Sequence, residues 1–255
     1  MLSERPWKVE AVAGLLVVLM LSLYGAGLLN VHLAHILPGK SVLGGRVLQF
    51  LINTFTFQAL GLICIHVFLR FQGLGWEELI GFKKARWKSI LAGLGAALIA
   101  LPVALAVKSL CAAVLTKIHV PLVEQEPIKV LQVSVSVGQR VMFALGAIVF
   151  APIVEESLFR GILYPAIKQE GFPRLALFGS SFLFALIHFN LMDFIPLFVL
   201  ALILVMVLEA TDTLLSTIVA HASFNAANFF IYLNTEAIAR WWRDLVQAII
   251  SINGS

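Results

Sequence analysis

Three short segments in the second half of the chain place ionisable and amide side chains within otherwise apolar sequence. They are residues 155–160 (EESLFR), 184–188 (FALIH) and 221–225 (HASFN). A glutamate with a histidine can activate a water molecule as a general base. A second imidazole and an amide N–H can stabilise the oxyanion that forms when water attacks a peptide carbonyl. These residue types could therefore activate water and stabilise an oxyanion in a hydrolytic reaction.

Helical spacing separates the two adjacent glutamates. Glu156 and Arg160 are four residues apart, so they share one helix face and can form an ion pair. Glu155 is turned by about 100° from Glu156 and is left free to address another neighbour. The alternative is that both glutamates belong to one structural ion network. His221 and Asn225 are also four apart and project from one face together.

The same side chains also allow a metal site. Glu155, His188 and His221 would supply three ligands and leave one position open, as in hydrolytic zinc sites. The sequence contains no H-E-x-x-H motif. The spacing alone leaves both direct activation of water and activation by zinc open.

The composition places these residues inside a membrane protein. Of the 255 residues, 60% are hydrophobic and 13% are charged, and the mean hydropathy is +0.98. A soluble domain usually carries about a quarter charged residues. The composition therefore excludes a soluble globular enzyme, a disordered protein and a disulfide scaffold. It predicts an all-α, polytopic transmembrane bundle of about seven to eight spans, with the bilayer as partner. The net charge of +4 is expected to meet lipid head groups rather than nucleic acid.

We expect one membrane domain over residues 1–255, with N-terminal spans within about 9–115 and a catalytic core at about 138–235. Residues 236–252 predict a C-terminal amphipathic helix that lies in the interface. The connection 70–88 holds the densest basic cluster, so the positive-inside rule places it, and the N-terminus, in the cytoplasm. The predicted helices cover residues 11–29, 47–69, 89–107, 138–168, 174–190, 194–208 and 213–233.

Distances along the chain give a check on depth. Glu155 precedes Gly171 by 16 residues and His188 follows it by 17. If two antiparallel helices flank the turn at Gly171, both side chains lie about 24 Å from it, at ~1.5 Å per residue. The predicted helices therefore bring Glu155 and His188 to one level.

The motifs E-E-x-x-x-R (155–160), F-x-x-x-H (184–188) and H-x-x-x-N (221–225) resemble those of the CPBP intramembrane endopeptidases. That family, also called Abi, includes type II CAAX prenyl endopeptidases and bacteriocin-processing or immunity proteins. The resemblance covers about residues 140–232 and implies a helical bundle around a cavity. It implies catalysis by Glu155 with His188, an oxyanion hole of His221 and Asn225, and support from Glu156 and Arg160. We expect Phe184 to line the cavity, and Asn228 either to line it or to bond to a neighbouring helix.

The resulting hypothesis is a CAAX type II endopeptidase that cleaves a membrane-associated or prenylated peptide or protein. We expect it in a bacterial inner membrane, with zinc as an alternative to metal-free catalysis. The sequence indicates no oligomeric state. One rival is a non-catalytic membrane protein, either a bacteriocin-immunity factor or a scaffold. A second is a transporter with the buried carboxylate and histidines as a proton relay, but no paired broken segments of inverted repeats support it.

Overall fold

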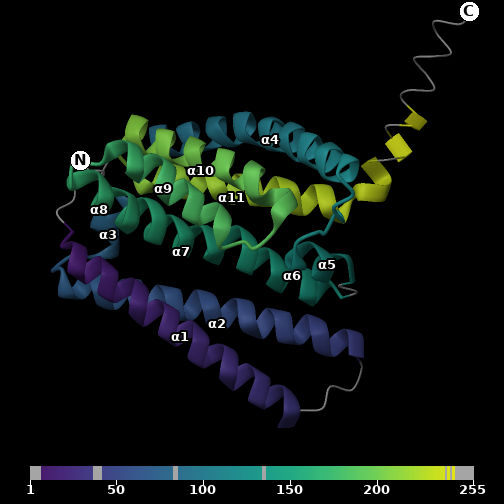
Figure 1. Ribbon diagram of the computed structural model, residues 1–255, viewed down its shortest axis with the longest axis horizontal. Coiled ribbons are helices and arrows are strands. Elements are labelled where there is room, and N and C mark those ends of the chain that lie inside the picture. Colours follow the sequence, from purple (N-terminus) through teal and green to yellow (C-terminus); the bar gives the residue numbers. More distant parts are fainter. Residues whose placement is uncertain are drawn as a thin grey trace, which may run out of the picture.

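The computed structural model describes residues 7–36, 42–82, 86–133 and 136–238, together with 240, 241, 243 and 244. Every regular element among these residues is helical, which confirms the predicted all-α bundle. Figure 1 shows α1 and α2 as a pair on one side of α7, with α4, α9, α10 and α11 on the other. The helices are α1 (Val9–Ile36), α2 (Val42–Phe71), α3 (Trp76–Ile80), α4 (Arg86–Lys117), α5 (Glu126–Val133), α6 (Val137–Ala144), α7 (Ala151–Leu158), α8 (Tyr164–Gln169), α9 (Pro173–Leu186), α10 (Leu191–Thr211) and α11 (Leu214–Leu233).

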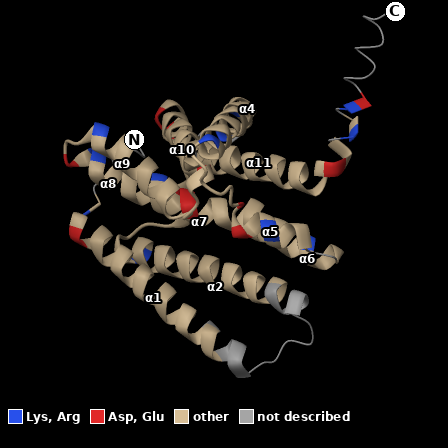
Figure 2. Ribbon diagram, turned by 45° about the vertical axis from the view of Figure 1, so that its right-hand side comes forward, with Lys and Arg blue, Asp and Glu red and all other residues tan. Residues whose placement is uncertain are grey.

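Among the described residues, six helical segments are long and apolar enough to cross a membrane, and the chain is a multi-pass membrane protein. Figure 2 shows the long uncharged stretches of α1 and α2. The predicted count of about seven to eight spans included the helix at 174–190. That helix, α9, has 14 residues, so it extends about 21 Å and is shorter than the hydrocarbon layer of about 30 Å. The six segments are Val9–Leu29, Val47–Phe71, Trp87–Lys117, Val137–Gln169, Leu191–Thr211 and Leu214–Leu233.

The span Val137–Gln169 contains two π-helical segments, η2 (Leu145–Phe150) and η3 (Phe159–Leu163), which lie on either side of α7. The backbone N–H of Ala151 donates to the carbonyl of Gly146, five residues earlier. The N–H of Tyr164 donates in the same way to Phe159. Short π-helical turns within α-helices are frequent at functional sites. Both glutamates therefore stand on an α-helical segment whose two ends have altered register.

Two glycines let neighbouring helices approach closely. A Cβ atom on Gly93 of α4 would lie 2.6 Å from the backbone oxygen of Ser216 in α11. One on Gly61 of α2 would lie 2.6 Å from Cγ1 of Val154 in α7. Small residues at such contacts are typical of helix packing in membranes. The contact at Val154 brings α2 against the residue that precedes Glu155.

Trp7 joins the segment before α1 to the span Val137–Gln169. Its side chain is buried, its indole N–H donates to the carbonyl of Gly161 at 3.0 Å, and its backbone N–H donates to Gln169 Oε1 at 3.1 Å. Its ring packs on Phe68 of α2, with centroids 5.1 Å apart. The α1–α2 pair is thereby held to η3 and α8.

The predicted interfacial helix at residues 236–252 lies largely outside the described residues. Those described between 236 and 244 are helical, and Trp241 is exposed.

Candidate active site

Glu156 is the buried centre of a polar network that joins four helical segments. Its side chain has 0% exposure, and its Oε1 accepts a hydrogen bond of 2.9 Å from Arg160 Nη1. Arg160 also donates from Nη2 to the carbonyl of Ala201 in α10, at 3.2 Å. The ion pair predicted from the i, i+4 spacing is therefore present, although the pair crosses from α7 into η3.

The same oxygen of Glu156 also contacts a histidine from α11. His221 Nδ1 lies 2.9 Å from Glu156 Oε1. An ionised carboxylate can only accept hydrogen bonds, so this nitrogen donates. The other ring nitrogen, Nε2, lies 3.9 Å from Oε2 of Glu155. His221 therefore lies between the two glutamates, with Nδ1 bonded to Glu156 and Nε2 3.9 Å from Glu155.

Glu155 nevertheless occupies a different environment from Glu156. Its side chain is 15% exposed and it lines a cavity. Arg160 bonds to Glu156 and not to Glu155 in the described residues. The register of α7 turns one carboxylate into the bundle and the other towards the cavity, which agrees with the separation predicted from the helical angle.

His188 follows α9 rather than standing on it. The predicted helix 174–190 ends at Leu186, because Phe189 has a left-handed backbone (φ 47°) and Asn190 begins the next helix. Asn190 Oδ1 accepts from the N–H of Asp193 at 3.0 Å and so caps α10. His188 Nδ1 lies 2.7 Å from the carbonyl of Phe184. A carbonyl only accepts, so Nδ1 donates and a neutral ring keeps its lone pair on Nε2.

Asn225 and Asn228 both line the cavity from α11. Asn225 Nδ2 donates to the carbonyl of Ala147 in η2 at 2.8 Å, which leaves the second amide N–H for another acceptor. Asn228 donates to the carbonyl of Phe224 in its own helix at 3.0 Å. The cavity-lining position predicted for Asn228 is present.

Phe184, which was also predicted to line the cavity, is not among the lining residues and has 0% exposure. Its ring lies behind the two histidines, with centroid distances of 5.0 Å to His188 and 5.6 Å to His221. The guanidinium carbon of Arg160 lies 4.4 Å from the same ring centroid. Phe184 therefore packs against the site residues from inside the bundle.

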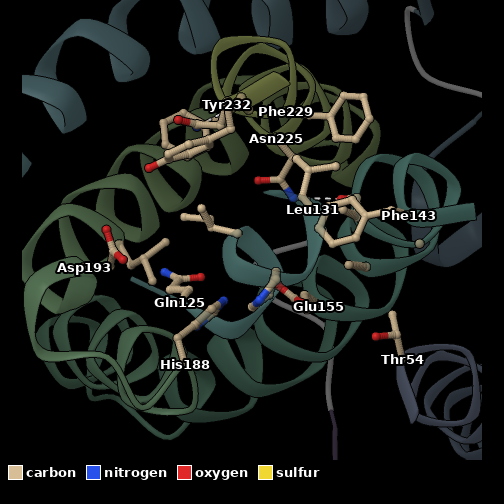
Figure 3. A pocket seen from close by; sticks show the side chains of 18 of the residues that line it. Thr54, Gln125, Leu131, Phe143, Glu155, His188, Asp193, Asn225, Phe229 and Tyr232 are labelled. Carbon is tan, nitrogen blue, oxygen red and sulfur yellow. Dashed lines mark hydrogen bonds between the residues drawn. The ribbon is translucent and has the colours of Figure 1, made fainter. Parts of the chain in front are cut away.

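The cavity itself has a volume of about 580 Å³ and a mostly apolar wall. Glu155, His188, His221 and Asn225 all contribute to that wall. Figure 3 shows the labelled Glu155, His188 and Asn225 directed into the same pocket, with the ring of His188 turned towards the side where Glu155 lies. The three predicted motifs therefore meet at one cavity, on α7, the turn after α9, and α11.

The wall includes polar residues that sequence reasoning did not select. Lys108 of α4 interrupts a long apolar segment, and this interruption was the available signal. Gln58 of α2 is 5% exposed, and its Oε1 has no partner among the described residues. No charge marks Gln58 in the sequence. Asp193 and Tyr232, which contact Lys108, also line the wall.

The side chains of the cavity differ from the ligand set of a metal site. Within the described ranges, no three His, Cys, Asp or Glu side chains are grouped so that they could hold a metal ion. Glu155, His188 and His221, the ligands of the zinc alternative, do not form such a group in this arrangement.

Comparison with known proteins gives one match. Residues 137–227 match the family model described as type II CAAX prenyl endopeptidase Rce1-like. No curated protein and no solved structure matches the chain. The matched segment includes the three motifs and ends between Asn225 and Asn228. The resemblance read from those motifs is thus confirmed over the segment that carries them, which is similar to the Rce1-like family of type II CAAX prenyl endopeptidases.

Proposed function

We propose that the protein is a glutamate-dependent intramembrane endopeptidase that cleaves a peptide bond of a membrane-associated or prenylated peptide or protein. The match of residues 137–227 to the Rce1-like family model supports a CAAX-type intramembrane protease. The observation that carries the finer proposal is the meeting of Glu155, His188, His221 and Asn225 at one cavity within a bundle of apolar helices.

Glu155 and His188 are the proposed activators of water. Glu155 presents its carboxylate to the cavity, and the Nδ1–H···O=C bond to Phe184 leaves Nε2 of His188 able to accept a proton. A water molecule between them gives a proton to the Glu155 carboxylate as its oxygen attacks the peptide carbonyl, whose oxygen becomes the oxyanion. The proton is then delivered to the leaving amine, as general acid–base catalysis requires.

His221 and Asn225 are the proposed donors to the oxyanion. Asn225 has one amide N–H left after its bond to Ala147. His221 donates from Nδ1 to Glu156, so donation from Nε2 requires protons on both ring nitrogens. The carboxylates at 2.9 Å and 3.9 Å stabilise that positive charge. Donors fixed in place before the reaction are effective because they need no reorganisation.

Glu156 and Arg160 have a supporting role in this proposal. The pair is buried, bonded to α10 and α11, and absent from the cavity wall. It orients His221 and does not itself reach the peptide. The proposed location is a bacterial inner membrane with a cytoplasmic N-terminus, and the basic connection 70–88 supports that orientation.

The decisive experiment compares cells that carry the wild-type protein with cells that carry Glu155→Gln. Mapping of the termini of membrane-associated proteins in both should reveal cleavage products that depend on Glu155 and so identify the substrate. Loss of those products with unchanged protein level supports the proposal. A non-catalytic immunity or scaffold protein predicts identical termini, and retention of biological activity, in the variant.

A further inference from the structure

Lys108 places a positive charge in the wall of the proposed catalytic cavity. It stands on α4, and its side chain is 19% exposed. Among the described residues that line the cavity, it is the one lysine or arginine. A cation within a membrane helix is costly and is found where it has partners or a function. The lengths and exposure of its contacts show which partner a ligand could replace.

Two contacts hold the ammonium group from the bundle side. Lys108 Nζ lies 2.9 Å from Asp193 Oδ1 of α10 and 2.9 Å from the hydroxyl of Tyr232 of α11. Asp193 is 5% exposed and sits in the first turn of α10. These short contacts to rigid helices fix the position of the charge at the cavity wall.

The third contact of Lys108, with Glu124, is longer and more exposed. Glu124, on the connection between α4 and α5, places Oε2 3.4 Å from Lys108 Nζ, and its side chain is 40% exposed. The same connection is held by the hydrogen bond of 2.8 Å from Asn190 Nδ2 to the carbonyl of Val123. The connection thus holds the carboxylate of Glu124 next to the ammonium group of Lys108. Of the three contacts of that group, this one is the longest, and Glu124 is the most exposed partner.

We propose that Lys108 binds a carboxylate of the substrate peptide, and that Glu124 occupies this position until the peptide arrives. This inference rests on the proposed endopeptidase function. Exchange of one carboxylate for another leaves the net charge of the cluster unchanged, so no additional unpaired charge is buried in the membrane. The short contacts to Asp193 and Tyr232 remain in place during the exchange. Lys108 is then a recognition residue, and Glu124 is a competitor supplied by the chain itself.

The carboxylate can be the C-terminus of the peptide or an Asp or Glu side chain, and three peptides distinguish these sources. One carries a free C-terminus, the second is the same peptide with an amidated C-terminus, and the third has its acidic side chains replaced by amides. Wild-type protein should show a higher KM for the peptide that lacks the recognised carboxylate, by about tenfold, the scale of a lost hydrogen bond to a charged group. Equal KM values for all three peptides would overturn the proposal.

Glu124→Gln gives the most specific test. Removal of the competitor should lower the KM of the carboxylate peptide about two- to fivefold, the scale of an exposed ion pair, without affecting the peptide that lacks the carboxylate. The matched control is Glu126→Gln, which removes a neighbouring carboxylate that pairs with Lys129 at 2.7 Å, whereas Glu124 contacts Lys108. An equal change with both peptides would contradict the exchange.

Lys108→Met should abolish the preference for the carboxylate peptide, through KM rather than kcat. Because this variant leaves Asp193 buried and unpaired, Lys108→Met/Asp193→Asn is the second form to measure. A retained preference in a folded variant would refute the role of Lys108. Binding of the three fluorescent peptides to Glu155→Gln protein separates the two proposals, because it reports recognition without cleavage. If wild-type protein binds the carboxylate peptide preferentially but never cleaves it, the endopeptidase function fails and the recognition site stands.

Discussion

Nδ1 of His221 lies 2.9 Å from Oε1 of Glu156, so the second glutamate of the adjacent pair, rather than the first, orients this imidazole. The same oxygen receives Arg160, and Arg160 in turn bonds to the backbone of Ala201. The imidazole is therefore held by a buried network that reaches from α7 and η3 to α10 and α11. The cavity receives only the opposite edge of the ring, which faces Glu155 at 3.9 Å.

Glu156→Gln is expected to lower the stability of the folded protein as well as its activity. Arg160 would remain 1% exposed without its counter-charge, and removing one partner of a buried pair costs about 3–5 kcal/mol. Thermal unfolding of the detergent-solubilised variant should therefore begin at a lower temperature than that of wild type. A variant as stable as wild type would contradict the structural role assigned to this pair. Glu156→Gln/Arg160→Met should recover part of the stability but little of the activity, because His221 stays without its carboxylate.

Glu155→Gln, unlike Glu156→Gln, is expected to lower activity without lowering stability. The change removes the proposed base from the cavity, so the rate of peptide hydrolysis should fall by at least the 10²–10⁴-fold that general base catalysis supplies. The melting temperature should stay close to that of wild type, because Glu155 has no hydrogen bond to the bundle among the described residues. Glu170→Gln, at an exposed glutamate beyond α8, is the matched control and should retain full activity. Full activity of purified Glu155→Gln would rule out the assignment.

Gly61→Ala tests the contact between α2 and α7. The new Cβ atom would lie 2.6 Å from Cγ1 of Val154, so the helices must separate or Val154 must move. Overpacking of this kind costs about 1–3 kcal/mol, and activity should fall with it because Val154 precedes Glu155. Val154→Ala in the same chain should restore the stability. Gly25→Ala in α1, where a Cβ meets nothing within 4 Å, should be neutral. An equal loss from both glycine variants would show that the contact is not the cause.

Chelation tests the proposed activation of water without zinc. Purified protein should keep its rate of cleavage after exhaustive treatment with a chelator, and elemental analysis should find zinc well below one equivalent. Loss of activity that zinc restores in proportion to its binding would overturn this part of the mechanism. The same measurement on His188→Ala would show whether that side chain is needed to bind the metal.

The sequence was sufficient for the fold class and for much of the site because both depend on local patterns. Apolar runs predicted the spans, and helical spacing predicted the pair of Glu156 and Arg160. The end of α9 was missed because Phe189 takes a left-handed backbone, which a phenylalanine in the sequence does not predict. The second role of Glu156 was missed as well, because contact with His221 depends on how α11 packs against α7.

Lys108 was not predicted as part of the cavity wall for a different reason. Its charge was visible in the sequence, but its partners Asp193 and Tyr232 stand on other helices, 85 and 124 positions further along the chain. No local spacing relates these three residues. The helix packing alone brings them to one wall of the cavity that also holds Glu155.

The π-helical segment η2 makes the site sensitive to changes in chain length. A turn closed between Gly146 and Ala151 holds one residue more than an α-helical turn. Deletion of a single residue from positions 148–150 would let that turn close as an α-helix, and would rotate the preceding residues, Ala147 among them, by about 100° relative to Glu155. The Ala147 carbonyl would then turn away from Asn225, although neither Asn225 nor any motif residue had changed. Among related chains, a one-residue gap at this point of an alignment would therefore mark an altered active site even where all three motifs are intact.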